Sequence, residues 1–343
     1  MLTWNNEFEF IRFLQRMRFS DSAVAVGIGD DSALVTVGRR NCLFTADMMI
    51  ENVHFRRNTC APEWLAHKLL ARSVSDIAAM GGRPTAYLVS LAVPPDISTD
   101  FLPRFFRGLK RVQKRMQAQL AGGDLSYSPT GILFSSLALL GQTTGAPLLR
   151  AGARQGDSIW VTGSLGMSAA ALELLKNGKV VVDAKRKEFH FPETSEPSQE
   201  QMLRKIMRAH FFPQPRLEAG QWLAKHRAAT ALIDLSDGLS TDLNRLCAAS
   251  RVGAVIHLGD IPIAPAVLRC AADPRGCALD GGEDYELLFT VPRRSEAKLR
   301  RFCSEVPLRR IGEIRHARRG VHLEAAGKLQ RLNPGGFDHF GNR

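Results

Sequence analysis

A glycine turn that leads directly into two adjacent carboxylates constrains this chain more than any other feature of its sequence. The turn reads Gly27-Ile28-Gly29-Asp30-Asp31. Glycines let a backbone approach a ligand closely, but a glycine loop that binds bare phosphates is not followed by acids, because these would repel the ligand. Carboxylates beside such a turn suit Mg²⁺, which then carries the phosphates. The alternative is an ordinary turn, since Gly and Asp both favour turns.

Further carboxylates stand at glycine turns, at expected strand ends, or on the helix before Gly81. They are Asp47, Asp76, Asp124, Asp234 with Asp237, and Glu283 with Asp284. In one cavity these acids would repel one another unless several divalent cations were bound. The sequence therefore favours a metal-assisted nucleotide site. It contains no Gly-Lys-Ser or Gly-Lys-Thr of a phosphate-binding lysine loop.

Some of these residues also allow simpler interpretations. Asp47 is the last residue of a strand expected over 41–47, and it could simply be a turn acid that ends this strand. His54 lies between Val53 and Phe55, a pattern that is also typical of a packed histidine. Asp76 lies in a small, apolar helical segment, where an acid must be paired, capped or metal-bound.

The length of 343 residues indicates two domains, which we place at 1–148 and 149–343. In the first domain we expect strands over 32–37, 41–47, 84–93 and 131–140, and a helix over 99–119 that ends at the turn before Asp124. In the second, strands and helices alternate, as in an α/β sheet with its ligand edge at strand-to-helix junctions. The polar stretch 177–201 is expected to be a surface excursion without an assigned role.

The formal charge of +12 raises the question of nucleic-acid binding. The basic residues are dispersed, however, and no aromatic ladder is interleaved with them, so nucleic acid is not the expected partner. A basic surface that attracts polyphosphate is favoured instead. Six cysteines without a CxxC pair indicate reduced thiols and a cytoplasmic chain. No apolar run is long enough to span a bilayer, and no membrane partner is expected.

Taken in order, the acidic motifs resemble those of bacterial thiamine-monophosphate kinases, a family of the AIR-synthetase-like (PurM-like) group. The resemblance runs from about Glu7 to Phe340 and rests on seven motifs, which are weak singly but specific in this order. The motifs are Gly27–Asp31, Asp47 with His54, Ser75–Gly81, Gly122–Asp124, Ile233–Gly238, Gly281–Glu286 and Gly335–Phe340.

This resemblance implies an N-terminal α+β domain with a four-stranded sheet, a larger C-terminal α/β domain, and a homodimer joined through the N-terminal sheets. It also implies phosphorylation of thiamine monophosphate by ATP, with several Mg²⁺ ions and no protein base or nucleophile. The Mg²⁺ ligands it implies are Asp31, Thr45, Asp47, Asp76, Asp124, Asp234 and Asp237, and we count Asp30 in the same metal site. The ATP contacts are Gly123, Asp124, Arg150 and Ser236, and the acceptor contacts are His54, Glu283 and Phe337.

Three residues depart from the family pattern. Ala46 and Met48 flank Asp47 where hydroxyl residues are common, and Leu125 follows Asp124 where a threonine is common. Because these changes remove possible metal or phosphate contacts, two alternatives stay open. One is another ATP-dependent enzyme of the PurM-like group. The other is a catalytically poor nucleotide-binding protein of the same fold.

Overall fold

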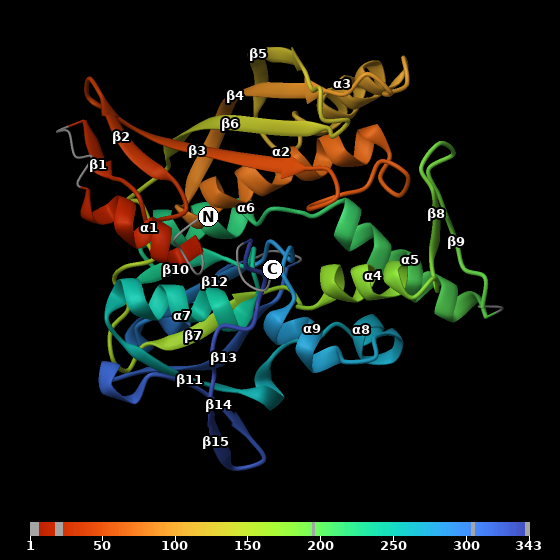
Figure 1. Ribbon diagram of the computed structural model, residues 1–343. Coiled ribbons are helices and arrows are strands. Elements are labelled where there is room, and N and C mark those ends of the chain that lie inside the picture. The colour runs from red at the N-terminus through yellow and green to blue at the C-terminus, as the bar shows by residue number, and fades with distance from the viewer. Residues whose placement is uncertain (1–6, 18–22, 194–195, 303–305, 340–343) are drawn as a thin grey trace.

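Two large β-sheets, one from each half of the sequence, organise the chain (Figure 1). The computed structural model describes residues 7–17, 23–193, 196–302 and 306–339. In Figure 1 the N-terminal sheet and its helices lie in the upper half, and the C-terminal sheet lies below them. The end of the described chain returns to the middle of the molecule in the same view. Phe340 and Cys303 lie outside the described residues.

The N-terminal sheet has six strands in the order β1-β2-β3-β6-β4-β5. Its strands are β1 (Val24–Val26), β2 (Ala33–Val37), β3 (Arg40–Ile50), β4 (Gly82–Val93), β5 (Gln119–Tyr127) and β6 (Phe134–Thr143), and the helices of this half are α1 (Glu7–Arg16), α2 (Pro62–Ala79) and α3 (Phe101–Val112). The four predicted strands are present as β2, β3, β4 and β6.

The prediction of only four strands was wrong, because the sheet also contains β1 and β5. The prediction of a helix through residue 119 was wrong as well. Helix α3 ends at Val112, and residues 119–127 instead pair in parallel with β4. Every residue of β5 is exposed, so no alternation of buried and polar residues marked it as a strand. As a result, Gly123 and Asp124 lie within an edge strand and not at a turn after a helix.

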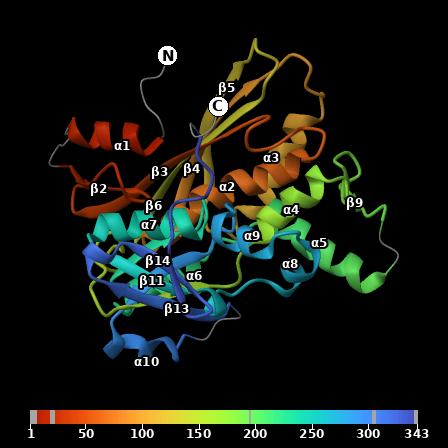
Figure 2. The same ribbon diagram turned by 60° about the horizontal axis from the view of Figure 1, so that its bottom comes forward.

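Helix α2 lies between the two halves of the molecule and is buried along nearly its whole length. It begins with Pro62, whose fixed φ and missing N–H suit the first helical turn. One side packs on the N-terminal sheet, and another contacts α6 and β10 of the C-terminal half. Helix α2 therefore lies at the seam between the two halves (Figures 1 and 2).

The C-terminal sheet has the order β10-β12-β7-β13-β11-β14-β15. Its strands are β7 (Ser158–Thr162), β10 (Ala231–Asp234), β11 (Gly253–His257), β12 (Leu287–Val291), β13 (Leu308–Arg315), β14 (Val321–Ala325) and β15 (Lys328–Arg331). The helices of this half are α4 (Met167–Lys176), α5 (Pro197–Phe211), α6 (Leu217–Lys225), α7 (Leu239–Ser250), α8 (Pro265–Cys270), α9 (Pro274–Asp280) and α10 (Glu296–Leu299), with single 3₁₀ turns η1 (Leu258–Asp260), η2 (Arg293–Ser295) and η3 (Ala317–Arg319).

The predicted polar excursion 177–201 is a short hairpin, β8 (Val181–Asp183) with β9 (Glu188–His190), that leads into α5. It is anchored to the N-terminal half, because Phe189 packs on Trp64 of α2 with ring centroids 5.1 Å apart. Helix α5 also packs here, through Phe211 at 4.8 Å from the same indole. The hairpin and α5 therefore help to fix α2 against the C-terminal half.

None of the helices in the described part of the chain combines the length and the hydropathy that crossing a bilayer requires.

Candidate active site

A cavity of about 620 Å³ opens at the seam between the two halves. Its wall combines residues of α2 and β3 with residues of the loops after β10 and α9 and of the C-terminal segment. Its polar lining includes Asp47, His54, Arg72, Asp76, Asp234, Ser236, Asp237 and Glu283, and the segment Gly335–Phe337 forms one side. Five of the nine acids predicted from the sequence to share one cavity therefore line it, namely Asp47, Asp76, Asp234, Asp237 and Glu283.

At one end of this cavity, Asp76 and Asp234 form a cluster of three carboxylates with Asp31, whose side chain is fully buried beside them. Oxygens of Asp31, Asp76 and Asp234 all lie within 4.8 Å of one another, and each comes from a different element. Asp31 follows the glycine turn, Asp76 is on α2, and Asp234 ends β10. Carboxylate oxygens at this spacing are the donor set that Mg²⁺ prefers. We call these three residues the acidic cluster.

Neighbouring hydroxyl groups hold the acidic cluster in position. The Thr45 hydroxyl donates a hydrogen bond of 2.5 Å to Asp76, and the Ser75 hydroxyl donates one of 2.6 Å to Asp234. The Arg150 guanidinium donates to one oxygen of Asp31 at 2.6 Å. The other oxygen of Asp31 is buried and has no hydrogen-bond partner among the described residues. A buried carboxylate oxygen without a partner is costly, and a bound cation would satisfy it.

Mutual repulsion makes the cluster unfavourable without cations. Burial raises the pKa of Asp76 well above its ordinary value, and the charges of Asp47, Asp234 and Asp31 raise it further. Burial and the charge of Asp31 likewise raise the pKa of Asp234. These carboxylates therefore hold protons more tightly than free ones, and divalent cations that replace the protons would relieve the repulsion.

Asp47 and Asp237 line the same cavity beside the cluster, and each contacts a cation of the protein. Asp47 accepts a hydrogen bond of 2.8 Å from the Ser73 hydroxyl and lies 3.5 Å from the Arg72 guanidinium. Asp237 forms an ion pair with Arg245 of α7. Both acids therefore lie within the site. An incoming cation would compete with an arginine for each carboxylate, and an incoming phosphate would compete with each carboxylate for its arginine.

The opposite end of the cavity is built around Glu283. Its carboxylate forms a 2.8 Å ion pair with Lys68, whose side chain is almost fully buried on α2. Burial raises the pKa of Glu283, but the charge of Lys68, with those of His210 and Arg72, outweighs it and lowers the pKa to about 2. Glu283 adopts a left-handed conformation with φ of 67°, which non-glycine residues rarely adopt. A fixed, ionised carboxylate therefore faces the cavity here.

His54 and Phe337 both line the cavity, and the ring of each packs against that of His339. Burial and the charge of Arg72 lower the pKa of His54 to about 4, so its ring is neutral at neutral pH. The Ile50 N–H donates to Nδ1 of His54 at 3.0 Å, which leaves Nε2 to carry the proton. Phe337 is 48% exposed and packs edge-on against His339. Its ring is therefore open to a ligand.

Gly123 and Asp124 lie outside this cavity and away from the acidic cluster of the same chain. In the sheet register Asp124 pairs with Ser90, Ser90 with Ser136, and Ser136 with Met48. Side chains in one such row share one face, and three strand spacings separate Asp124 from Met48 by roughly 14 Å. Asp47, one residue along, faces α2. Asp124 therefore lies on the opposite face of the sheet from the acidic cluster, and Gly123 is beside it on the edge strand.

The same alternation explains where the departures from the family pattern lie. Ala46 and Met48 are exposed and point away from α2, whereas Thr45 and Asp47 point toward it. The face with Ala46 and Met48 also carries Phe44, which is 47% exposed, and Leu88, which is 48% exposed. We call this surface the open face. The changes at residues 46 and 48 alter the open face and leave the acidic cluster intact.

Asp30 has a structural partner instead of a place in the cavity wall. Its carboxylate accepts the backbone N–H of Arg150 at 3.2 Å. Burial and the adjacent charge of Asp31 raise the pKa of Asp30 to about 6, although Arg150 lowers it in part. Asp284 is likewise structural, since it accepts the N–H of Gly166 at 2.7 Å at the start of α4. Of each adjacent pair of acids, one residue therefore belongs to the site and the other binds backbone N–H groups.

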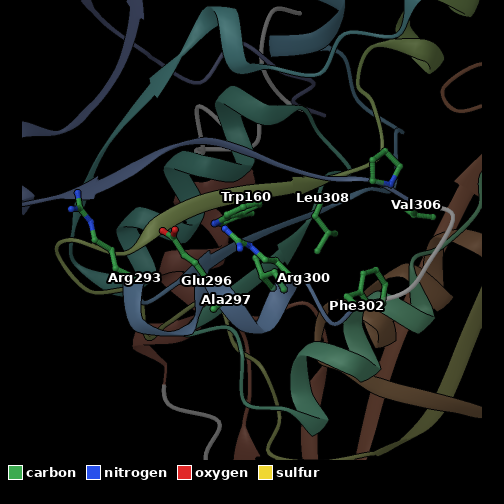
Figure 3. Close-up of a pocket in the computed structure, with 10 residues that line it drawn as sticks. Trp160, Arg293, Glu296, Ala297, Arg300, Phe302, Val306 and Leu308 are labelled. Atoms are coloured by element: carbon green, nitrogen blue, oxygen red, sulfur yellow. The ribbon is translucent and has the colours of Figure 1, made fainter.

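A second pocket, of about 580 Å³, lies against β7, α10 and β13 and is drawn in Figure 3. Its labelled side chains include Trp160, Arg293, Arg300 and Leu308, with Glu296 as the acid. One carboxylate beside two arginines offers no site for a divalent cation. The chemistry of this chain is therefore assigned to the cavity at the seam.

Five further residues of the site were not predicted from the sequence, namely Lys68, Arg72, Ser73, Ser75 and His210. Lys68, Arg72 and Asp76 are spaced four residues apart, which places them on one side of α2. This spacing is the sequence signal that could have identified Lys68 and Arg72 as neighbours of Asp76. His210 lies 142 residues from Lys68 in the sequence, and no local pattern connects them.

The family described as AIR synthase related protein, N-terminal domain, matches residues 29–143. The corresponding C-terminal domain family matches residues 154–323. Together these matches cover most of the chain, and they define it as a two-domain AIR-synthase-related protein.

Curated relatives narrow the class further. Thiamine-monophosphate kinase of Escherichia coli K12 is 36% identical over 341 residues, which is 97% of this chain and 98% of that protein. The enzyme of Bacillus subtilis is 33% identical over 340 residues, covering 98% of this chain and 99% of that protein. The chain belongs to the thiamine-monophosphate kinase family.

Solved structures agree with this assignment. One described as AaThiL complexed with AMPPCP and TMP has a TM-score of 0.81 and 32% identity, and covers 97% of both chains. Thiamine-monophosphate kinase from Stenotrophomonas maltophilia has a TM-score of 0.73 and 32% identity, covering 96% of this chain and 98% of that one. Hydrogenase maturation protein HypE shares the fold, with a TM-score of 0.63 at 18% identity, covering 94% of this chain and 96% of that one.

Proposed function

We propose that the protein transfers the γ-phosphoryl group of ATP to thiamine monophosphate and forms thiamine diphosphate. The observation that carries this proposal is the acidic cluster, whose three carboxylates lie within 4.8 Å of one another and two of which line the seam cavity. Family membership supports the substrates, since a related structure is described as holding AMPPCP and TMP.

The donor set fits Mg²⁺. Asp31, Asp76 and Asp234 would hold it, with the Thr45 hydroxyl and Asp47 beside them and Asp237 across the cavity. Bound Mg²⁺ would neutralise the phosphates of ATP and the charge that develops during transfer. Arg150 and Ser236 adjoin the same region and are the proposed ATP contacts.

The reaction needs no protein base. A phosphomonoester has a second pKa of about 6, so its attacking oxygen is already anionic at neutral pH. That oxygen forms a bond to the γ-phosphorus of ATP while the bond from phosphorus to the bridging oxygen breaks, and the electron pair leaves with ADP. The protein has to align the two phosphates and offset their charge.

Glu283, His54 and Phe337 are the proposed contacts to the acceptor. Glu283 places a carboxylate near the cationic thiazolium or the pyrimidine amine. The exposed ring of Phe337 offers a face for a flat cation, which is worth about 0.5–2 kcal/mol. Neutral His54 carries an Nε2–H that can donate to the acceptor.

We propose that the protein acts as a homodimer joined through the open face. Phe44, Met48 and Leu88 leave apolar surface on one side of a sheet whose other side is buried. Clustered exposed apolar residues of this kind mark association surfaces. Because Asp124 lies on this face, we propose that Gly123 and Asp124 serve a nucleotide site only across the dimer, on the partner copy. The five described cysteines are free thiols, which suits a cytoplasmic enzyme.

The direct test is turnover. With Mg²⁺, ATP and thiamine monophosphate, purified protein should release ADP and form thiamine diphosphate in equal amounts, and chelation of the metal should stop both. Thiamine in place of its monophosphate is the control for the acceptor phosphate. Binding of Mg·ATP without any turnover of thiamine monophosphate would refute the kinase and leave a nucleotide-binding protein.

A further inference from the structure

Arg72 occupies the point between the two ends of the cavity. On α2 it is one turn from Lys68 in one direction and one turn from Asp76 in the other, and each turn advances about 5.4 Å along the helix. Lys68 contacts Glu283 at the acceptor end, and Asp76 belongs to the acidic cluster. Arg72 therefore lines the cavity where a donor phosphate on the cluster and an acceptor phosphate would meet.

The guanidinium of Arg72 is largely buried but has few polar contacts. Its side chain is 18% exposed, and its contact with Asp47 is a single ion pair at 3.5 Å. Within the described residues it makes no hydrogen bond that would satisfy its five N–H donors. Asp47 has a better partner in the Ser73 hydroxyl at 2.8 Å, so it does not depend on Arg72 for its position.

The other half-buried arginines of the described chain behave differently. Each donates a hydrogen bond to a carboxylate, as Arg104 does to Glu63 and Arg150 to Asp31. The same is true of Arg57, Arg216, Arg245 and Arg315. An enclosed arginine whose donors remain available and face a cavity is arranged for a ligand instead of for the fold.

We propose that Arg72 is a further catalytic residue, which binds the phosphate of the acceptor and directs one of its oxygens toward the acidic cluster. This inference rests on the proposed kinase function. The fork of a guanidinium matches two phosphate oxygens at once, which fixes the orientation of the group as well as its position. Its positive charge also offsets the approach of two anionic phosphates, each of which would otherwise repel the other.

The decisive experiment compares thiamine monophosphate with thiamine, which differ only in the phosphate. Binding of each is measured by calorimetry in the presence of Mg²⁺ and a non-hydrolysable ATP analogue, and kcat and KM are measured in parallel. The variants are Arg72→Met, which keeps the bulk but removes the charge, and Arg72→Lys, which keeps the charge but loses the fork. Arg104→Met is the matched control, since Arg104 is 14% exposed and lies on α3 away from the cavity.

Arg72→Met should weaken thiamine monophosphate binding about 10- to 100-fold, as expected for the loss of hydrogen bonds to a charged group. Thiamine and the ATP analogue should bind as in the wild type. Arg72→Lys should regain part of the binding but little of kcat, because a point charge does not orient the phosphate. Arg104→Met should change neither.

Three results would separate the possible failures. If Arg72→Met weakens thiamine and thiamine monophosphate equally, Arg72 only shapes the cavity and the inference is wrong. If it leaves both affinities and kcat unchanged, the residue has no role in the reaction. If wild-type protein binds the ATP analogue but not thiamine monophosphate, the proposed function fails and the inference fails with it.

Discussion

Asparagine at position 76 should make the metal-free protein more stable while it abolishes activity. Asp76 lies within 4.8 Å of both Asp31 and Asp234. At an effective dielectric constant of about 20, two charges at that distance repel by about 3.5 kcal/mol. Protonation and Arg150 offset part of this repulsion, so we expect Asp76→Asn to gain about 1–3 kcal/mol in the free energy of unfolding. The Thr45 hydroxyl can still donate to the amide oxygen.

The sign of the pH dependence gives a second readout of the same change. The folded-state pKa of Asp76 is raised, so the folded protein binds this proton more tightly than the unfolded chain does. Metal-free wild-type protein should therefore lose stability as pH rises above the ordinary value of 3.8 and through the raised folded-state pKa. Asp76→Asn should flatten this part of the pH profile.

Urea unfolding of metal-free protein at acidic and at mildly basic pH, followed by a Mg²⁺ titration of the melting temperature, tests both expectations. Exposed Asp260 provides the control substitution, Asp260→Asn, because it lies on the 3₁₀ turn η1 outside the cavity. The reasoning would be refuted if Asp76→Asn lowered metal-free stability at basic pH, or if it kept the stabilisation by Mg²⁺ and near wild-type turnover.

Other consequences of the site can be measured separately. Phe337→Ala should raise KM for thiamine monophosphate about 2- to 30-fold, while KM for ATP and the melting temperature change little. If the melting temperature falls and KM rises for both substrates, the ring only packs against the protein. Phe44→Asp on the open face should give a monomer by light scattering with reduced turnover, whereas an unchanged dimer would exclude that interface. Alkylation of the thiols in native protein should leave activity intact, because none of the glycine–acid turns contains a cysteine. Burial also raises the pKa of the Cys60 thiol to about 12. Inactivation without unfolding would favour a thiol mechanism.

The sequence alone determined the features that depend on neighbours in the chain. Glycine turns followed by acids indicated residues of the site, and the spacing of apolar residues predicted β2, β3, β4 and β6 within three residues of their observed ends. These features are local, because a turn residue, a helix-starting proline or an alternating strand pattern acts within a few residues. The order of seven weak motifs was enough to indicate the family.

Only the tertiary structure decided which acids act together. Asp31 enters the cluster, whereas adjacent Asp30 binds the backbone of Arg150. Asp124 lies on the far side of the sheet, because side-chain direction alternates with each residue of a strand. The partners Lys68 and Glu283 are 215 residues apart and meet only when α2 is enclosed between the two domains. Such pairings depend on long-range packing, which brings charges together at distances that no local pattern encodes.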